Sequence, residues 1–101
     1  MIALIVKFKS RFSYEEVLKI ANDRADQFRA IDGLLQKYYL KYADDNNYGA
    51  VYLWESEEAL QEFRNSELAA TIAETYGVVG DLDLRMAEVI MPLRTEAKLP
   101  V

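Results

Sequence analysis

The sequence alternates between strand-type and helix-type periodicity in the order β-α-β-β-α-β. Helical spacing of apolar residues predicts a first helix over about Tyr14–Ala30 and a second helical region after Ser56. Strand-type segments are predicted over Ile2–Lys9, Leu34–Tyr42, Tyr48–Trp54 and Asp81–Met91. This order is typical of an α+β ferredoxin-like fold, in which a four-stranded antiparallel sheet carries both helices on one face. We therefore predict one such domain over residues 1–92 and a C-terminal tail over residues 93–101.

Serine residues mark the expected beginnings of the helices. Ser13 with Glu16 fits a capping box, in which each side chain bonds the other residue's backbone amide. Ser56 precedes two glutamates that complement the helix dipole. Ser66 is a second cap, so we expect the second helix to break near Asn65 and to end before Gly77.

The run Asp44–Asn47 predicts a turn, because short polar side chains bond the local backbone and tolerate left-handed conformations. The central glycine and terminal glutamate of a calcium-binding loop are absent from it. The two flanking strands therefore form a hairpin. In the returning strand, Gly49, Val51 and Leu53 should pack under the helices, and the opposite face, with Ala50, Tyr52 and Trp54, should point away from them.

The loop length decides which residues of the preceding strand share this aromatic face. A five-residue loop, which we favour, places Tyr38 and Gln36 there. A loop one residue longer places Tyr39 and Lys37 there instead, since a slip of one residue inverts every side chain. The aromatic face then has two interpretations: side chains that fill an interface between two sheets, or walls of a cavity for an apolar, aromatic ligand. Judged from the residues alone, the aromatic face is better explained as an interface between two sheets than as the wall of a cavity.

Composition limits the possible functions. With 51% hydrophobic and 12% aromatic residues in a chain of 101, the apolar surface exceeds what one small core can bury, which predicts a homodimer. No cysteine and no histidine are present, so thiolate chemistry and the usual general base and metal ligand are excluded. The net charge of −5 disfavours nucleic-acid binding. The apolar N-terminal stretch is too short for a signal sequence or membrane span, so we expect a cytoplasmic protein without a membrane partner.

Charged residues on the predicted strands are the remaining candidates for chemistry. Lys7, Lys37, Lys41 and Arg85 could bind an acidic or enolate ligand, although lysine and arginine on strands more often extend to solvent. The paired glutamates of the helices are explained by the helix dipole. The sequence contains no phosphate-binding glycine loop and no nucleophile elbow.

Three segments carry a resemblance to a known family. They are Gly33–Tyr39, Gly49–Leu60 and Ser66–Ala70, which together resemble the dimeric α/β-barrel superfamily, and within it the YdhR-type mono-oxygenases, relatives of the antibiotic-biosynthesis monooxygenases. The order and spacing match over nearly the whole chain. These motifs are more specific for the fold than for an activity, since the superfamily also includes haem degraders, decyclases and proteins with no known reaction.

The resemblance implies a homodimer whose sheets close into a barrel, with a ligand cavity on the side of each sheet away from the helices. Trp54 stands where several relatives place a cavity tryptophan. Oxygenases of this kind deprotonate a phenol or quinol, whose carbanion reduces O₂ without flavin, haem or metal. The groups available for this are Tyr52, Tyr38, Trp54, Gln36, Lys37 and Arg85. Haem-degrading relatives use a histidine ligand, which this chain lacks.

Three hypotheses follow. The first is a cofactor-independent monooxygenase-like protein acting on a small aromatic or polyketide-type substrate, with Trp54, Tyr52 and Tyr38 in the pocket. The second is a non-catalytic dimer that binds a small molecule or fills its barrel with side chains. The third is an isomerase or decyclase that uses the same cavity. The sequence identifies neither the substrate nor a catalytic residue.

Overall fold

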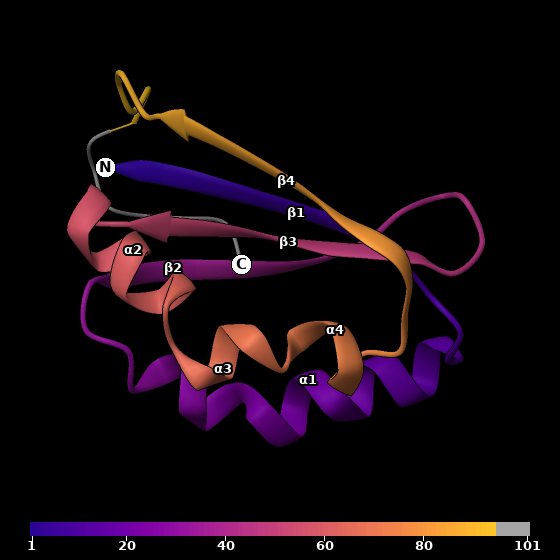
Figure 1. Cartoon of the computed structure of the whole chain (residues 1–101). Helices are drawn as coiled ribbons and strands as arrows, with labels where there is room; N and C mark the ends of the chain where they lie inside the picture. The colour runs from indigo at the N-terminus through magenta and orange to yellow at the C-terminus, as the bar shows by residue number, and fades with distance from the viewer. Residues whose placement is uncertain (95–101) are drawn as a thin grey trace.

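The computed structural model describes residues 1–94, and the elements follow the predicted order (Figure 1). The strands are β1 (Ile2–Ser10), β2 (Leu34–Lys41), β3 (Asn47–Trp54) and β4 (Val78–Glu88). The helices are α1 (Tyr14–Arg29), α2 (Glu57–Arg64), α3 (Glu67–Ala70) and α4 (Ile72–Thr75). The four strands form one antiparallel sheet in the order β2-β3-β1-β4, and the helices lie on one side of it (Figure 1). The ferredoxin-like prediction is therefore confirmed.

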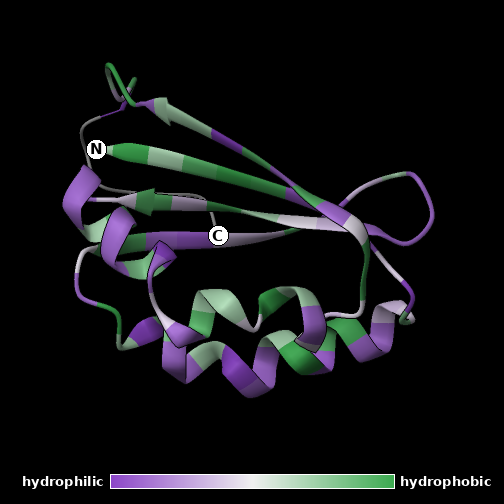
Figure 2. Ribbon diagram, in the orientation of Figure 1, coloured by the Kyte–Doolittle hydropathy of each residue, from purple (hydrophilic) through white to green (hydrophobic). Residues whose placement is uncertain are grey.

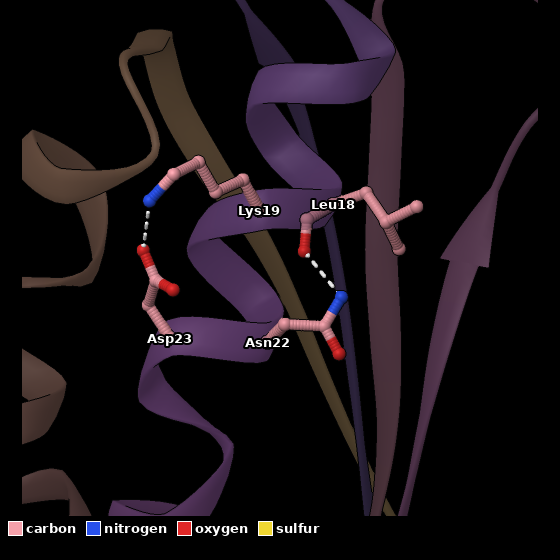
Figure 3. Close-up of polar contacts among 4 residues, drawn as sticks. All are labelled: Leu18, Lys19, Asn22 and Asp23. Atoms are coloured by element: carbon pink, nitrogen blue, oxygen red, sulfur yellow. Dashed lines mark hydrogen bonds and ion pairs between the residues drawn. The ribbon is translucent and has the colours of Figure 1, made fainter.

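Helix α1 begins where its capping box predicts. The Ser13 hydroxyl accepts from the Glu16 amide at 3.2 Å, and the Ser13 amide donates to the Glu16 carboxylate at 3.3 Å. The outer face of α1 is polar: Lys19 pairs with Asp23 at 2.7 Å, and the Asn22 side chain donates to the Leu18 carbonyl at 3.0 Å (Figure 3). Such exposed contacts add little stability, so the helix is held mainly by its inner face.

The second helical region breaks at the predicted place. The Ser56 hydroxyl accepts from the Ala59 amide at 3.1 Å at the beginning of α2. The Ser66 hydroxyl accepts from the Ala69 amide at 3.2 Å, so a new N-terminus forms at α3. After α4 the chain reverses at Gly77, whose φ of +61° favours glycine.

The prediction for β3 was wrong about which face meets the helices. Tyr48, Ala50, Tyr52 and Trp54 are buried on the helix side. Their rings meet aromatic residues from two helices, because Phe28 of α1 lies 6.0 Å from Phe63 of α2 and both contact Tyr52. These helices contribute large apolar groups, and only the aromatic face of β3 fills the space against them.

The prediction failed at Gly49 because a small residue is needed there for the approach of two strands, and not for packing under the helices. A Cβ atom added at Gly49 would lie 2.0 Å from the Val6 carbonyl oxygen of β1. Glycine is required here by the close approach of two strand backbones. Gly49, Val51 and Leu53 therefore belong to the face of the sheet that no helix covers.

The favoured register of the hairpin was also wrong, and the alternative is correct. Lys37 pairs with Tyr52 and Tyr39 with Ala50, so both lie on the helix side. The loop is one residue longer than preferred, and Asn46 within it has a φ of +62°. Tyr38, opposite Val51, consequently lies on the uncovered face. A bulge at Leu35 then shifts the pairing between Leu34 and Gln36.

Strand β4 begins and ends three residues earlier than the predicted Asp81–Met91. Its limits follow its pairing with β1, from Ser10 opposite Val78 to Ile2 opposite Glu88. A single sequence carries no signal for this pairing, because strand ends are set by the partner strand.

The uncovered side of the sheet, called the open face below, carries Ile5, Tyr38, Leu40, Val51 and Leu53 with Lys7 and Arg85. The five apolar or aromatic residues are only partly buried in the single chain. Hydrophobic segments run along β1 and β3 (Figure 2). An open face of this kind is a candidate for contact with another surface.

No helix within residues 1–94 is long and apolar enough to cross a membrane. The predicted tail over residues 93–101 lies mostly outside the described residues, so its boundary and any exchange of the tail between protomers stay predictions.

Candidate active site

A cavity of about 150 Å³ lies between the sheet and α1, on the side opposite to the one expected from the resemblance. Ala21 of α1 and Ala50 of β3 face it and leave room, because neither side chain extends beyond Cβ. Its walls include Val6, Phe8, Val17, Lys37, Tyr39, Tyr52, Ile72 and Tyr76. The cavity is therefore mainly apolar, with two lysines, Lys37 and Lys41, and several phenol groups among its lining residues.

The Lys37 amine is surrounded by aromatic rings. Its Nζ atom lies 3.4 Å from the ring centre of Phe28, 4.4 Å from that of Tyr39 and 4.6 Å from that of Tyr52. These residues come from α1, β2 and β3, so the fold itself assembles this cage. Ring faces attract a cation, and they therefore stabilise the protonated amine when it forms.

Burial, together with the smaller effect of the nearby positive charge of Arg24, lowers the pKa of Lys37 to about 7. Protonated and neutral amine are consequently both populated near neutral pH. A group with this property can accept a proton from a ligand and return it, which is what acid–base catalysis requires. An ordinary exposed lysine is almost entirely protonated at the same pH.

Tyr76 lines the cavity, and its hydroxyl is buried without a partner among the described residues. The side chain is only 6% exposed, and its hydroxyl has no hydrogen-bond partner within residues 1–94. The buried Ser10 hydroxyl fixes the backbone beneath it by donating to the Tyr76 carbonyl at 2.6 Å. An unpaired buried hydroxyl is unfavourable, so Tyr76 is a donor that an acceptor oxygen would satisfy once the side chain turns toward it.

The phenol groups remain protonated at neutral pH. Burial raises the pKa of Tyr76 to about 12, and it also raises the pKa values of Tyr52 and Tyr39. These hydroxyls can therefore donate to an oxygen on a ligand but cannot serve as bases. Lys37 is the lining group whose lowered pKa lets it take a proton near neutral pH.

Arg24 adds positive charge beside this cluster. Its Nη2 atom donates to the Thr71 hydroxyl at 2.9 Å, whereas its buried Nη1 atom has no partner among the described residues. Arg24 acts electrostatically on Lys37, Tyr52 and Tyr76. Its charge favours an anion in the cavity. Arg24 was not predicted, although it lies between Ala21 and Phe28 at helical spacing, which is the signal that could have placed it on the inner face.

A second cavity of about 340 Å³ meets the first at Lys37 and Tyr39. Its other walls come from the end of α1 and the beginning of β2, including Arg29, Leu35 and Gln36. It is more polar than the first. Lys37 therefore contributes to the walls of both cavities.

The structure separates the six predicted site residues. Tyr52 and Lys37 lie together at the cavity, and Gln36 lines only the second one. Tyr38 and Arg85 lie on the open face, where Arg85 pairs with Asp83 at 3.4 Å. Trp54 is fully buried and packs 5.1 Å from Phe63, so it belongs to the core and not to the cavity wall. Among the described residues, no group of three or more acidic side chains could hold a metal ion.

Comparison with known proteins identifies the fold. No family model and no curated protein matches the sequence. A protein of unknown function from Nitrosomonas europaea is 18% identical, with a TM-score of 0.75, over 99% of this chain and 94% of the other. SnoaB, a cofactor-independent oxygenase from Streptomyces nogalater, is 15% identical, with a TM-score of 0.74, over 91% and 95%. An antibiotic biosynthesis monooxygenase is 15% identical, with a TM-score of 0.69, over 90% and 100%.

These similarities confirm the fold expected from the resemblance, which is that of the antibiotic-biosynthesis-monooxygenase structures. The sequence identities are too low for residue roles to be transferred. What the site can do therefore rests on its own geometry: an apolar space, an amine that exchanges a proton near neutral pH, and a buried hydroxyl that needs an acceptor.

Proposed function

We propose that this protein is a cofactor-independent monooxygenase-like enzyme that acts on a single-ring phenol or quinol bound between the sheet and α1. One observation carries the proposal: the Lys37 amine lies in an aromatic cage at the edge of an apolar cavity. The proposal retains the predicted chemistry but moves it to the other side of the sheet. Trp54, Tyr38 and Arg85 are replaced as site residues by Tyr76 and Arg24.

The volume supports a small substrate. A cavity of about 150 Å³ is comparable with engineered protein cavities of similar size that take up benzene. One aromatic ring fits this space, whereas a polyketide of several fused rings would need the second cavity as well. We therefore favour a single-ring substrate.

In the proposed reaction, the phenol oxygen accepts a hydrogen bond from Tyr76, and neutral Lys37 removes the phenolic proton. The resulting phenolate lies beside the lysine ammonium and the charge of Arg24, which stabilise it. The electron-rich ring then reduces O₂. A ring carbon loses its hydrogen and gains one oxygen atom, the second oxygen atom leaves as water, and the product is a quinone. The substrate thus supplies all the electrons.

The test is O₂ consumption and quinone absorbance with a panel of single-ring phenols and hydroquinones. We expect turnover that rises with pH to a plateau above about 7 as Lys37 loses its proton. The substitution Lys37→Met should lower the rate by roughly 100-fold or more, the usual effect of losing a general base. Lys19→Met, on the outer face of α1 (Figure 3), should leave it unchanged.

Two results would contradict the proposal in different ways. Phenol binding without O₂ consumption would favour the non-catalytic alternative. An oxidation rate equal in wild type and Lys37→Met would show that the lysine does not act as the base.

We also propose that the protein is a homodimer that pairs through the open face. The support is the partly buried apolar surface of Ile5, Val51 and Leu53, which no element in residues 1–94 covers. The predicted interface was aromatic, whereas the side chains of the open face are mainly aliphatic. The cavity lies on the other side of the sheet, so each protomer would contain its own site.

A further inference from the structure

We propose that Lys37 is also a nucleophile that forms an imine with small aromatic aldehydes entering the cavity. This activity goes beyond the proposed oxidation, since it needs neither O₂ nor a phenol. Lys37 would thus bind carbonyl compounds that contain one aromatic ring through a covalent bond.

The position of the amine provides the first argument. Lys37 lines both cavities, so a ligand can approach its side chain through space that the protein does not fill. The ion pairs of residues 1–94 involve Lys19, Arg29 and Arg85, and none holds the Lys37 amine. Its three close neighbours are ring faces, which hold an ammonium ion without accepting its proton.

The ionisation of the amine provides the second argument. Only an unprotonated amine attacks a carbonyl group, and a desolvated lysine is the usual form of such a nucleophile. The low pKa of Lys37, about 7, leaves a large fraction of the amine unprotonated at neutral pH. Exposed lysines keep ordinary pKa values near 10.4 and are mostly protonated under the same conditions.

The unpaired hydroxyl provides the third argument. Tyr76 lines the same cavity, and its hydroxyl lacks a partner within the described residues. An aldehyde oxygen is a hydrogen-bond acceptor, so it would satisfy this donor. The bond would also polarise the carbonyl group and make its carbon atom more electrophilic.

The reaction balances without a further reagent. The Lys37 nitrogen attacks the carbonyl carbon, and a proton moves from nitrogen to the former carbonyl oxygen to give a carbinolamine. The C–O bond then breaks, the hydroxyl leaves as water with one more proton, and a C=N bond forms. The imine is reversible, so its detection requires reduction by added cyanoborohydride, which supplies a hydride to the carbon atom.

The experiment uses benzaldehyde with cyanoborohydride at pH 7 under anaerobic conditions, followed by intact mass spectrometry and peptide mapping. We expect one benzyl group on Lys37 among the six lysines of the chain. Its labelling rate should exceed that of exposed Lys19 by about tenfold or more, because the lowered pKa of Lys37 keeps a large fraction of its amine unprotonated at pH 7. The rate at Lys37 should increase with pH and level off above about 7.

Matched variants separate the explanations. Lys37→Arg keeps a cation in the cage but should lose the fast label, whereas Lys19→Arg should retain it. Tyr76→Phe should slow the labelling of Lys37 without changing that of Lys19. Equal labelling of Lys37 and Lys19 in the wild type, or a pH profile that rises toward pH 10, would overturn the proposal. The oxidation is measured with O₂ and phenols, so either proposal can fail while the other holds.

Discussion

At the scale of single residues, the environment of Lys37 determines what its amine can do. Lys37 and Lys41 lie on the same strand and on the same side of the sheet. Lys37 reaches three rings within 5 Å, whereas the Lys41 amine lies 5.1 Å from one ring, that of Tyr14. Burial thus gives the first lysine an environment that the second lacks, although the side chains are identical.

The low pKa of Lys37 predicts a pH-dependent effect on stability. The unfolded chain binds a proton at Lys37 below about 10.5, whereas the folded chain binds it only below about 7. Between these values the unfolded state holds more protons, so the free energy of unfolding rises with pH. Lys37→Met lacks this dependence. We expect Lys37→Met to be more stable than wild type at pH 6, and this difference to fall by on the order of 1 kcal/mol per pH unit between about 7 and 10.5.

Urea unfolding at pH 6 and pH 10 measures this difference. The advantage of Lys37→Met should shrink at the higher pH. A constant difference across the range would show that Lys37 titrates like an exposed lysine, and Lys19→Met provides the exposed reference.

At the scale of elements, the helices were predictable and the faces of the strands were not. Serine caps and helical spacing are local signals, so Ser13, Ser56 and Ser66 defined the helix beginnings correctly. The face of a strand depends on its partners. Tyr52 lies on the helix side, where it packs against Phe28. Lys37 lies on the same side because the hairpin loop is one residue longer than expected. Those are long-range interactions, which one sequence does not reveal.

The pairing of β1 with β3 predicts a specific sensitivity at Gly49. Gly49→Ala would place Cβ 2.0 Å from the Val6 carbonyl oxygen, so the two strands would have to separate. We expect a loss of stability of about 1–3 kcal/mol, as for other overpacked sites. Gly80→Ala is the matched control, because its φ of +77° is strained but no atom lies within 4 Å of the added Cβ.

Thermal unfolding of both variants tests this explanation. Gly80→Ala should lose only roughly 1 kcal/mol of folding stability, which is the cost of an alanine in a backbone conformation that favours glycine. If Gly49→Ala were as stable as wild type, the close approach of β1 and β3 would be the wrong reason for glycine at this position.

At the scale of the whole molecule, composition predicted more apolar surface than one core can bury, and the open face provides it. Val51 and Leu53 of β3 and Ile5 of β1 lie there together. An uncovered apolar face was predictable, but the residues that form it were not, because the prediction exchanged the aromatic and aliphatic faces of β3. The homodimer and the cytoplasmic location stay predictions.

A charge on the open face should disrupt the proposed dimer. We expect wild type to be a dimer by size-exclusion chromatography with light scattering, and Val51→Glu to be a folded monomer, because a buried unpaired carboxylate is strongly unfavourable at an interface. Asp23→Lys, on the outer face of α1 (Figure 3), should remain dimeric. A wild-type monomer at micromolar concentration would contradict the proposal.

Both proposals for the cavity depend on the ionisation of one amine, which NMR can follow in protein labelled at the lysine side chains. The Lys37 signal, assigned by its loss in Lys37→Arg, should titrate with a midpoint of about 7. The signals of the other lysines provide the reference in the same spectra. A midpoint near 7 would support a lysine that exchanges its proton in the working pH range. Titration of Lys37 together with the exposed lysines would contradict its roles as base and as nucleophile.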